Sequence, residues 1–157
     1  MSEMSKQTAE CLNRAGWDRD RRIDSAEYEA LLTAAGFTVL DAAVEFLKEF
    51  GGLYIKYPHA KVVGLEDNMH FDLSIVVKEI QPIKVDAYSK VIGKQLCPIG
   101  KAARGYLILM MDEAGQVYAS YDDFFTRLGT SGLAAIDALC TGKELEAIPM
   151  ANNWDAV

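Results

Sequence analysis

The hydrophobic period of this chain changes at Gly51-Gly52, and the change limits the folds open to it. Before these glycines, apolar residues recur at helical offsets, whereas after them Leu53, Ile55 and Tyr57 alternate with more polar residues, as in a strand with one buried face. Helices followed by strands with interspersed helices do not form the regular alternation of a parallel βαβ fold. We therefore predict an α+β domain, in which an antiparallel or mixed sheet carries helices mainly on one face.

Three helices are expected before the glycine pair. The first spans residues 5–15. Asp24 is the expected cap of the second, with Glu27 three positions later as in a capping box, and Gly36 provides its left-handed end. Asp41 is the expected cap of the third.

The second half alternates strands with further helices. In chain order we expect a strand over residues 70–75, a helix over 85–92, a loop over 97–100, hairpin strands over 106–111 and 116–121, and a helix over 133–140. No repeat or linker divides the chain, so residues 1–150 are expected to form a single domain, with residues 151–157 as a C-terminal tail.

Charge is distributed unevenly along the chain. The total is −7, but residues 1–104 carry only −1 and residues 105–157 carry −6. An acidic field repels phosphate and anionic lipid and attracts basic proteins, so neither nucleic acid nor membrane is an expected partner. The N-terminus resembles no secretory signal, and three widely spaced cysteines suggest reduced thiols. These features predict a cytoplasmic protein.

No pattern of metal-binding or catalytic residues emerges. A segment beginning at Gly16 echoes a calcium loop, but Gly16 stands where an Asp ligand is needed and Arg21 where the turn glycine belongs. His59 and His70 lie outside any zinc motif, and nothing near Cys97 would lower the pKa of its thiol. We therefore predict no cofactor, no metal and no catalytic residue.

Two pairs of carboxylates, Asp112-Glu113 and Asp122-Asp123, allow two interpretations. They could form the acid and base of a small hydrolase, which requires a raised pKa in a concave site. Both pairs also have the composition of turns. Asp122 and Asp123 stand directly before Phe124, and acidic groups beside large aromatic residues are typical of protein interfaces.

The sequence resembles the third family of the SUKH superfamily, immunity proteins of bacterial toxin systems related in fold to the yeast Smi/Knr regulators. The resemblance covers roughly residues 12 to 142. It is carried by phrases that include Ala15-Gly16-Trp17, Phe50-Gly51-Gly52-Leu53, Leu96-Cys97-Pro98-Ile99-Gly100, Asp112-Glu113-Ala114-Gly115-Gln116-Val117-Tyr118 and Ala135-Ile136-Asp137-Ala138-Leu139.

This resemblance implies an α+β fold, cytoplasmic residence, no catalysis and tight binding of a cognate toxin domain. Because the chain is acidic, we expect a basic, nuclease-like toxin, and we expect the immunity protein to be a monomer or weak dimer. The alternatives are a regulatory scaffold for an endogenous protein and the small hydrolase. The toxin-binding residues that we expect are Asp112, Glu113, Tyr118, Asp122, Asp123 and Phe124.

Overall fold

The computed structural model describes residues 4–150, which form six helices and a six-stranded sheet. The expected tail over residues 151–157 lies outside the described residues. The helices are α1 (Lys6–Arg14), α2 (Ala26–Ala34), α3 (Asp41–Phe50), α4 (Leu73–Glu79), α5 (Pro82–Ile92) and α6 (Gly132–Thr141). The strands are β1 (Tyr54–Pro58), β2 (Glu66–His70), β3 (Leu96–Ala102), β4 (Leu107–Asp112), β5 (Val117–Tyr121) and β6 (Phe124–Gly129).

The strands pair in chain order, β1-β2-β3-β4-β5-β6, and every neighbouring pair is antiparallel. The predicted α+β fold is confirmed, and the sheet is antiparallel rather than mixed. The hairpin expected between residues 106 and 121 is formed by β4 and β5, and the helices expected over residues 85–92 and 133–140 are α5 and α6.

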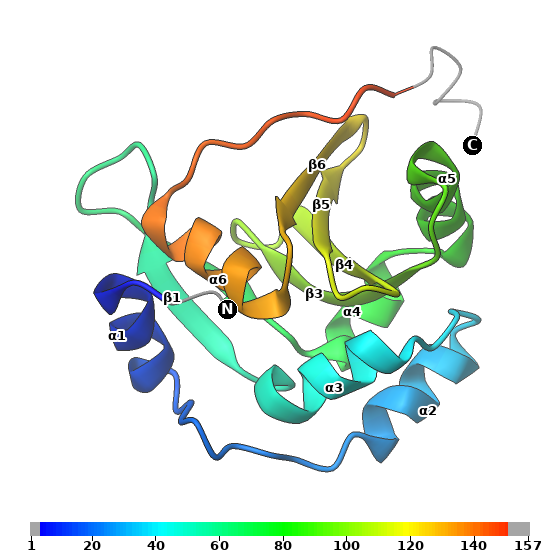
Figure 1. The fold of residues 1–157 in the computed structure, drawn as a ribbon, viewed down its shortest axis with the longest axis horizontal. Helices are drawn as coiled ribbons and strands as arrows, with labels where there is room; N and C mark the ends of the chain where they lie inside the picture. The colour runs from blue at the N-terminus through cyan, green and yellow to red at the C-terminus, as the bar shows by residue number, and fades with distance from the viewer. Residues whose placement is uncertain (1–3, 151–157) are drawn as a thin grey trace.

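Helices α3 and α6 lie together on one face of the sheet (Figure 1). Phe46 of α3 and Ile136 of α6 line the same small interior space as Leu109 of β4, which assigns both helices to the Leu109 face. Helix α5 contacts the other face, because its Tyr88 packs on Phe125, with 4.9 Å between ring centroids. The residue next to Phe125 in β6 lies on the Leu109 face. Because neighbouring strand residues point to opposite faces, Phe125 points to the other face, where α5 lies.

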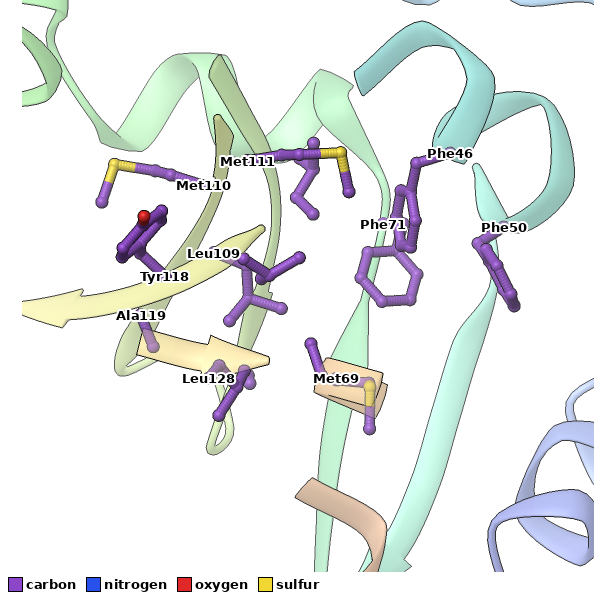
Figure 2. Packing of buried hydrophobic residues seen from close by; sticks show 14 of the residues in the cluster. Phe46, Phe50, Met69, Phe71, Leu109, Met110, Met111, Tyr118, Ala119 and Leu128 are labelled. Carbon is purple, nitrogen blue, oxygen red and sulfur yellow. The ribbon is translucent and has the colours of Figure 1, made fainter. Parts of the chain in front are cut away.

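The centre of the core is aromatic. The ring centroids of Phe46 and Phe50 are 4.9 Å apart, and those of Phe46 and Phe71 are also 4.9 Å apart, in a T-shaped arrangement. Figure 2 shows these three rings together beside the sheet. Each such pair contributes about 0.5–1.5 kcal/mol beyond the area it buries. Gly132, at the start of α6, lies directly against the Phe46 ring, so α6 approaches α3 closely because Gly132 has no side chain.

The strand predicted over residues 70–75 is wrong. Strand β2 ends at His70, and α4 begins at Leu73. Asp72 is the N-cap of α4, and its carboxylate accepts a hydrogen bond from the Ser74 N–H at 3.1 Å. This cap stabilises a helix start where apolar and polar residues alternate by coincidence.

The loop predicted over residues 97–100 is also wrong, because this segment lies in β3, whose seven residues are all buried. Proline has no N–H for a sheet hydrogen bond, and it is tolerated here because the β3–β4 register shifts between Pro98 and Gly100. The Gly100 Cα lies against the His70 carbonyl and the Phe71 ring, where a side chain would collide. The Pro and Gly therefore mark a bulged strand instead of a loop.

The first three helices are confirmed, but two of the expected caps are displaced by one residue. Ser25, not Asp24, precedes α2, although the Asp24 carboxylate still accepts from the Ala26 N–H at 2.9 Å. Leu40 precedes α3, so Asp41 is the first residue of the helix itself. There its carboxylate still lies at the positive end of the helix dipole.

Candidate protein-binding surface

Asp112 was expected on the binding surface, but it is fully buried, and that part of the prediction is wrong. Its Oδ1 accepts hydrogen bonds from the Ala114 and Gln116 N–H groups at 2.9 and 3.0 Å. Its Oδ2 accepts from the Tyr118 hydroxyl at 3.0 Å and lies 3.7 Å from Lys94 Nζ. The Asp112 carboxylate thus holds the β4–β5 turn together and is not available to a partner.

Tyr118 is also buried, so its expected place on the surface is wrong too. Burial and the hydrogen bond to Asp112 raise the pKa of its phenol to about 12. Glu113 is exposed, but it lies at the β4–β5 turn, whereas Asp122, Asp123 and Phe124 follow the other end of β5. A five-residue strand separates its two ends by roughly 15 Å.

The remaining three predicted residues do lie together. Asp122 and Asp123 are exposed in the β5–β6 turn, and the half-buried Phe124 begins β6. The structure adds Tyr106 and Tyr121, whose rings meet edge to face with centroids 6.0 Å apart. We refer to Tyr106, Tyr121, Asp122, Asp123 and Phe124 as the tyrosine–aspartate surface.

Both tyrosines of this surface are unusually open to solvent. Tyr106 is 60% exposed and Tyr121 49% exposed. The sequence pattern places each tyrosine only at the end of a hairpin strand and does not by itself indicate a binding role. The pairing of β4 with β5 does indicate that the two tyrosines are neighbours. Since Ile108 pairs with Ser120, residues 106 and 121 must be close at the open end of this hairpin.

A cleft of about 320 Å³ opens beside the two tyrosines, between α5 and the sheet. Ile108 and Ser120 contribute from the sheet and Tyr88 from α5. The Tyr88 hydroxyl donates to the Asp122 carbonyl at 2.6 Å, which ties the β5–β6 turn to α5. We refer to this hollow as the α5 cleft; its lining residues are Glu79, Ile80, Gln81, Lys84, Tyr88, Tyr106, Ile108, Ser120, Tyr121 and Asp122.

The two turns that border the tyrosine–aspartate surface use left-handed backbone at non-glycine residues. Asp122 has φ 51°, and in the β3–β4 turn Ala103 and Arg104 have φ 51° and 56°. Left-handed backbone costs a non-glycine residue roughly 1–2 kcal/mol. Consecutive positive φ values match the twist of a tight hairpin, which explains the β3–β4 turn. Together these turns place Tyr106 and Asp122 at the same end of the sheet.

Comparison with known protein families identifies the chain. Residues 4–142 match the model of the SUKH-3 immunity protein family. The chain belongs to this family. The resemblance seen in the sequence is thereby confirmed, and the protein has an immunity role, the neutralisation of a toxin. No curated protein and no solved structure matches the chain.

The SUKH-3 match includes every helix and strand of the described residues, and the tyrosine–aspartate surface lies within it. A second exposed apolar group in this SUKH-3 protein lies on the β1–β2 connection, where Val62 and Leu65 flank a completely exposed Val63. It lacks the combination of aromatic rings and carboxylates found at the tyrosine–aspartate surface.

The described residues were also compared with the requirements of a reactive thiol, a metal site and a membrane-spanning helix, and they meet none of these requirements. Cys97 is buried, and burial raises the pKa of its thiol to about 11. Within residues 4–150, no cluster of three or more His, Cys, Asp or Glu side chains is placed to hold a metal ion. No helix in the same part of the chain has the length and apolar character needed to span a membrane.

Proposed function

We propose that this immunity protein neutralises its toxin by non-catalytic binding in the cytoplasm, with the tyrosine–aspartate surface as the contact face. The observation that carries the proposal is the exposure of Tyr106 and Tyr121 beside Asp122 and Asp123. Tyrosine is enriched among the residues that dominate binding energy, whereas carboxylates at the rim orient the partner and exclude wrong ones. A surface with two exposed tyrosines and two neighbouring carboxylates fits a protein inhibitor, acting as a monomer or weak dimer.

The charge distribution supports a basic partner, such as a nuclease. Residues 105–157, which include the whole tyrosine–aspartate surface, carry −6 of the total −7. A basic toxin would be attracted to this part of the protein over roughly one Debye length, about 8 Å at physiological salt. The same acidic charge would repel nucleic acid, so direct binding of nucleic acid is not expected of this protein.

The state of the partly buried carboxyl groups supports a non-catalytic role. Burial would raise the pKa of Asp72, but hydrogen bonds from Ser74 and Tyr54 outweigh it and lower the pKa below its ordinary value. The same balance lowers the pKa of Asp137, where Thr8 donates. A general acid needs the opposite shift. Asp112, part of one proposed acid–base pair, is enclosed by the turn that it stabilises.

Titration of the toxin tests the non-catalytic part of this proposal. The toxin domain encoded beside this gene is mixed with increasing amounts of the immunity protein, and the remaining toxin activity is measured. Stoichiometric binding predicts a linear fall to zero at about one equivalent. Complete loss of toxin activity at a small fraction of an equivalent would instead reveal turnover and overturn the proposal.

Paired variants test the position of the contact face. The double variant Tyr106→Ser/Tyr121→Ser should weaken binding by about tenfold or more and abolish growth rescue on co-expression with the toxin. Val63→Ser, which alters the exposed apolar group on the β1–β2 connection, is the matched control and should rescue growth fully. If Val63→Ser lost rescue and the tyrosine variant kept it, the contact face would lie elsewhere.

A further inference from the structure

The α5 cleft has the composition of a receptor for a cationic side chain. We propose that it accepts an arginine of the toxin, whose guanidinium lies against Tyr106 and Tyr121 and pairs with Asp122. This inference rests on the proposed function and adds the chemistry of the partner residue.

Two features of the cleft favour a cation. An aromatic ring attracts a positive charge to its face, and both exposed tyrosines line the cleft. Asp122 also lines it and is an exposed residue with a carboxylate side chain. A cation held between an aromatic face and a carboxylate gains from both, which is the arrangement of a binding hot spot.

The other charged groups restrict where that cation can lie. Glu79 is engaged by the buried amine of Lys101, so Asp122 is the carboxylate left to face a partner inside the cleft. Lys84 lines the α5 side and repels a second cation placed next to it. The guanidinium therefore belongs on the sheet side, next to the two tyrosines.

Arginine suits this position better than lysine. Its planar guanidinium stacks on an aromatic ring and still presents N–H groups at its edge to a carboxylate. Lysine has a strongly hydrated ammonium that loses more solvation when it enters a cleft lined by Ile80 and Ile108. The cleft thus distinguishes between the two basic residues.

The cleft is held in shape before binding. Tyr88 connects three elements, because its hydroxyl donates to the Asp122 carbonyl at 2.6 Å while its ring packs on Phe125. Phe125 is fully buried and stacks in turn on Tyr118, with centroids 5.6 Å apart. Since the turn that carries Asp122 is already fixed, little ordering is required when a partner binds.

The test uses the intact, isotope-labelled protein and two small probes, N-acetyl-arginine amide and N-acetyl-citrulline amide. These probes have nearly the same shape, but only the first is charged. With the arginine probe, the backbone amide signals of Ile108, Ser120 and Tyr121 should shift saturably in NMR spectra. The citrulline probe should bind at least about threefold more weakly, as expected for loss of a cation–π contact and an ion pair.

Three variants locate the effect. Tyr121→Leu and Asp122→Asn should each weaken binding of the arginine probe by about threefold. Glu113→Gln removes a carboxylate at the distant β4–β5 turn and should leave binding unchanged. Equal binding of the two probes, absence of saturable shifts at the cleft, or an equal effect of Glu113→Gln would each overturn the arginine assignment.

These outcomes are independent of the toxin titration. If the toxin binds stoichiometrically and the arginine probe does not bind the cleft, the proposed function stands and this inference falls. If the probe binds and the neighbouring toxin does not, the cleft recognises arginine and the proposed neutralisation of that toxin by binding is wrong.

Discussion

The hydroxyl of Tyr118 donates a hydrogen bond of 3.0 Å to the Asp112 carboxylate, and both side chains are buried. The Asp112 carboxylate also accepts from two N–H groups of the β4–β5 turn and lies near Lys94. A buried carboxylate is stable only when its lone pairs are satisfied in this way. Two residues that the sequence suggested as partner-binding therefore stabilise the fold instead.

Asp112→Ala should lower the free energy of unfolding by about 2–3 kcal/mol. The substitution leaves the Tyr118 hydroxyl and two turn N–H groups without their acceptor, and hydrogen bonds to charged groups contribute about 1.5–3 kcal/mol. Urea denaturation measures the change. Glu113→Ala is the control and should change stability by less than about 0.5 kcal/mol. An Asp112→Ala protein as stable as the Glu113→Ala protein would contradict this account of the turn.

Gly132→Ala should destabilise the protein by about 1–3 kcal/mol, because the added methyl group collides with the Phe46 ring. Phe46→Leu alone also destabilises, since it removes a stacked ring. Combined, the two changes should cost less than the sum of the single effects, because the smaller side chain makes room for the methyl group. Thermal or urea denaturation of all four proteins measures this coupling, and simple additivity would show that α6 does not press on Phe46.

Stability should decrease as the pH falls below about 6.5, owing to His70. Burial lowers the pKa of His70 in the folded protein, and its Nδ1 accepts from the Asp72 N–H at 3.2 Å. The neutral ring is therefore preferred when folded. Its contribution is complete above the unfolded pKa of about 6.5 and is lost as the pH falls through 6.5 toward the folded pKa. For one proton the slope is at most about 1.4 kcal/mol per pH unit.

His70→Gln provides the control for this pH dependence. Glutamine does not titrate, so the variant should show a flatter stability profile between pH 6.5 and 5 in urea denaturation. Asp72 contributes in the same direction but in a separate range, because its pKa is lowered from 3.8 and its contribution is lost only as the pH falls below that value. An unchanged profile in the His70→Gln protein would assign the pH dependence to other groups.

The helices and the main hairpin were predictable from the sequence because each repeats a local pattern. Phe46 and Phe50 follow the period of one helix face, and left-handed glycines such as Gly93 and Gly142 end two of the helices. The errors at residues 70–75 and 97–100 have a different cause. Asp72 caps a helix. Pro98 lies in a strand because a bulge accommodates it, and Gly100 has no side chain where the His70 carbonyl approaches. Both errors arise from interactions that the local hydrophobic period of the sequence does not reveal.

The candidate site was only partly predictable, for a related reason. Acidic turns are recognisable in a sequence, but whether a turn carboxylate points outward or accepts hydrogen bonds from its own turn depends on the geometry of the hairpin. Asp112 points inward, whereas Asp122 and Asp123 are exposed. Tyr106 joins the candidate site only because the folded hairpin brings its ring against Tyr121. The cleft forms only because α5 covers the other face of the sheet. Neither arrangement is visible in the local sequence.

Neutralising Asp122 and Asp123 should slow association with the cognate toxin by about threefold to tenfold at low salt, and this difference should shrink at physiological salt. Exposed charges act mainly on the association rate, and salt screens them. Asn is the appropriate substitution at Asp122, because that residue has φ 51° and asparagine tolerates left-handed backbone. Stopped-flow or surface-plasmon measurements at two salt concentrations compare Asp122→Asn/Asp123→Asn with Glu113→Gln, which alters one acidic charge at the other end of β5. If the double variant associated with the toxin as fast as the wild-type protein at low salt, the acidic turn would not lie at the toxin interface.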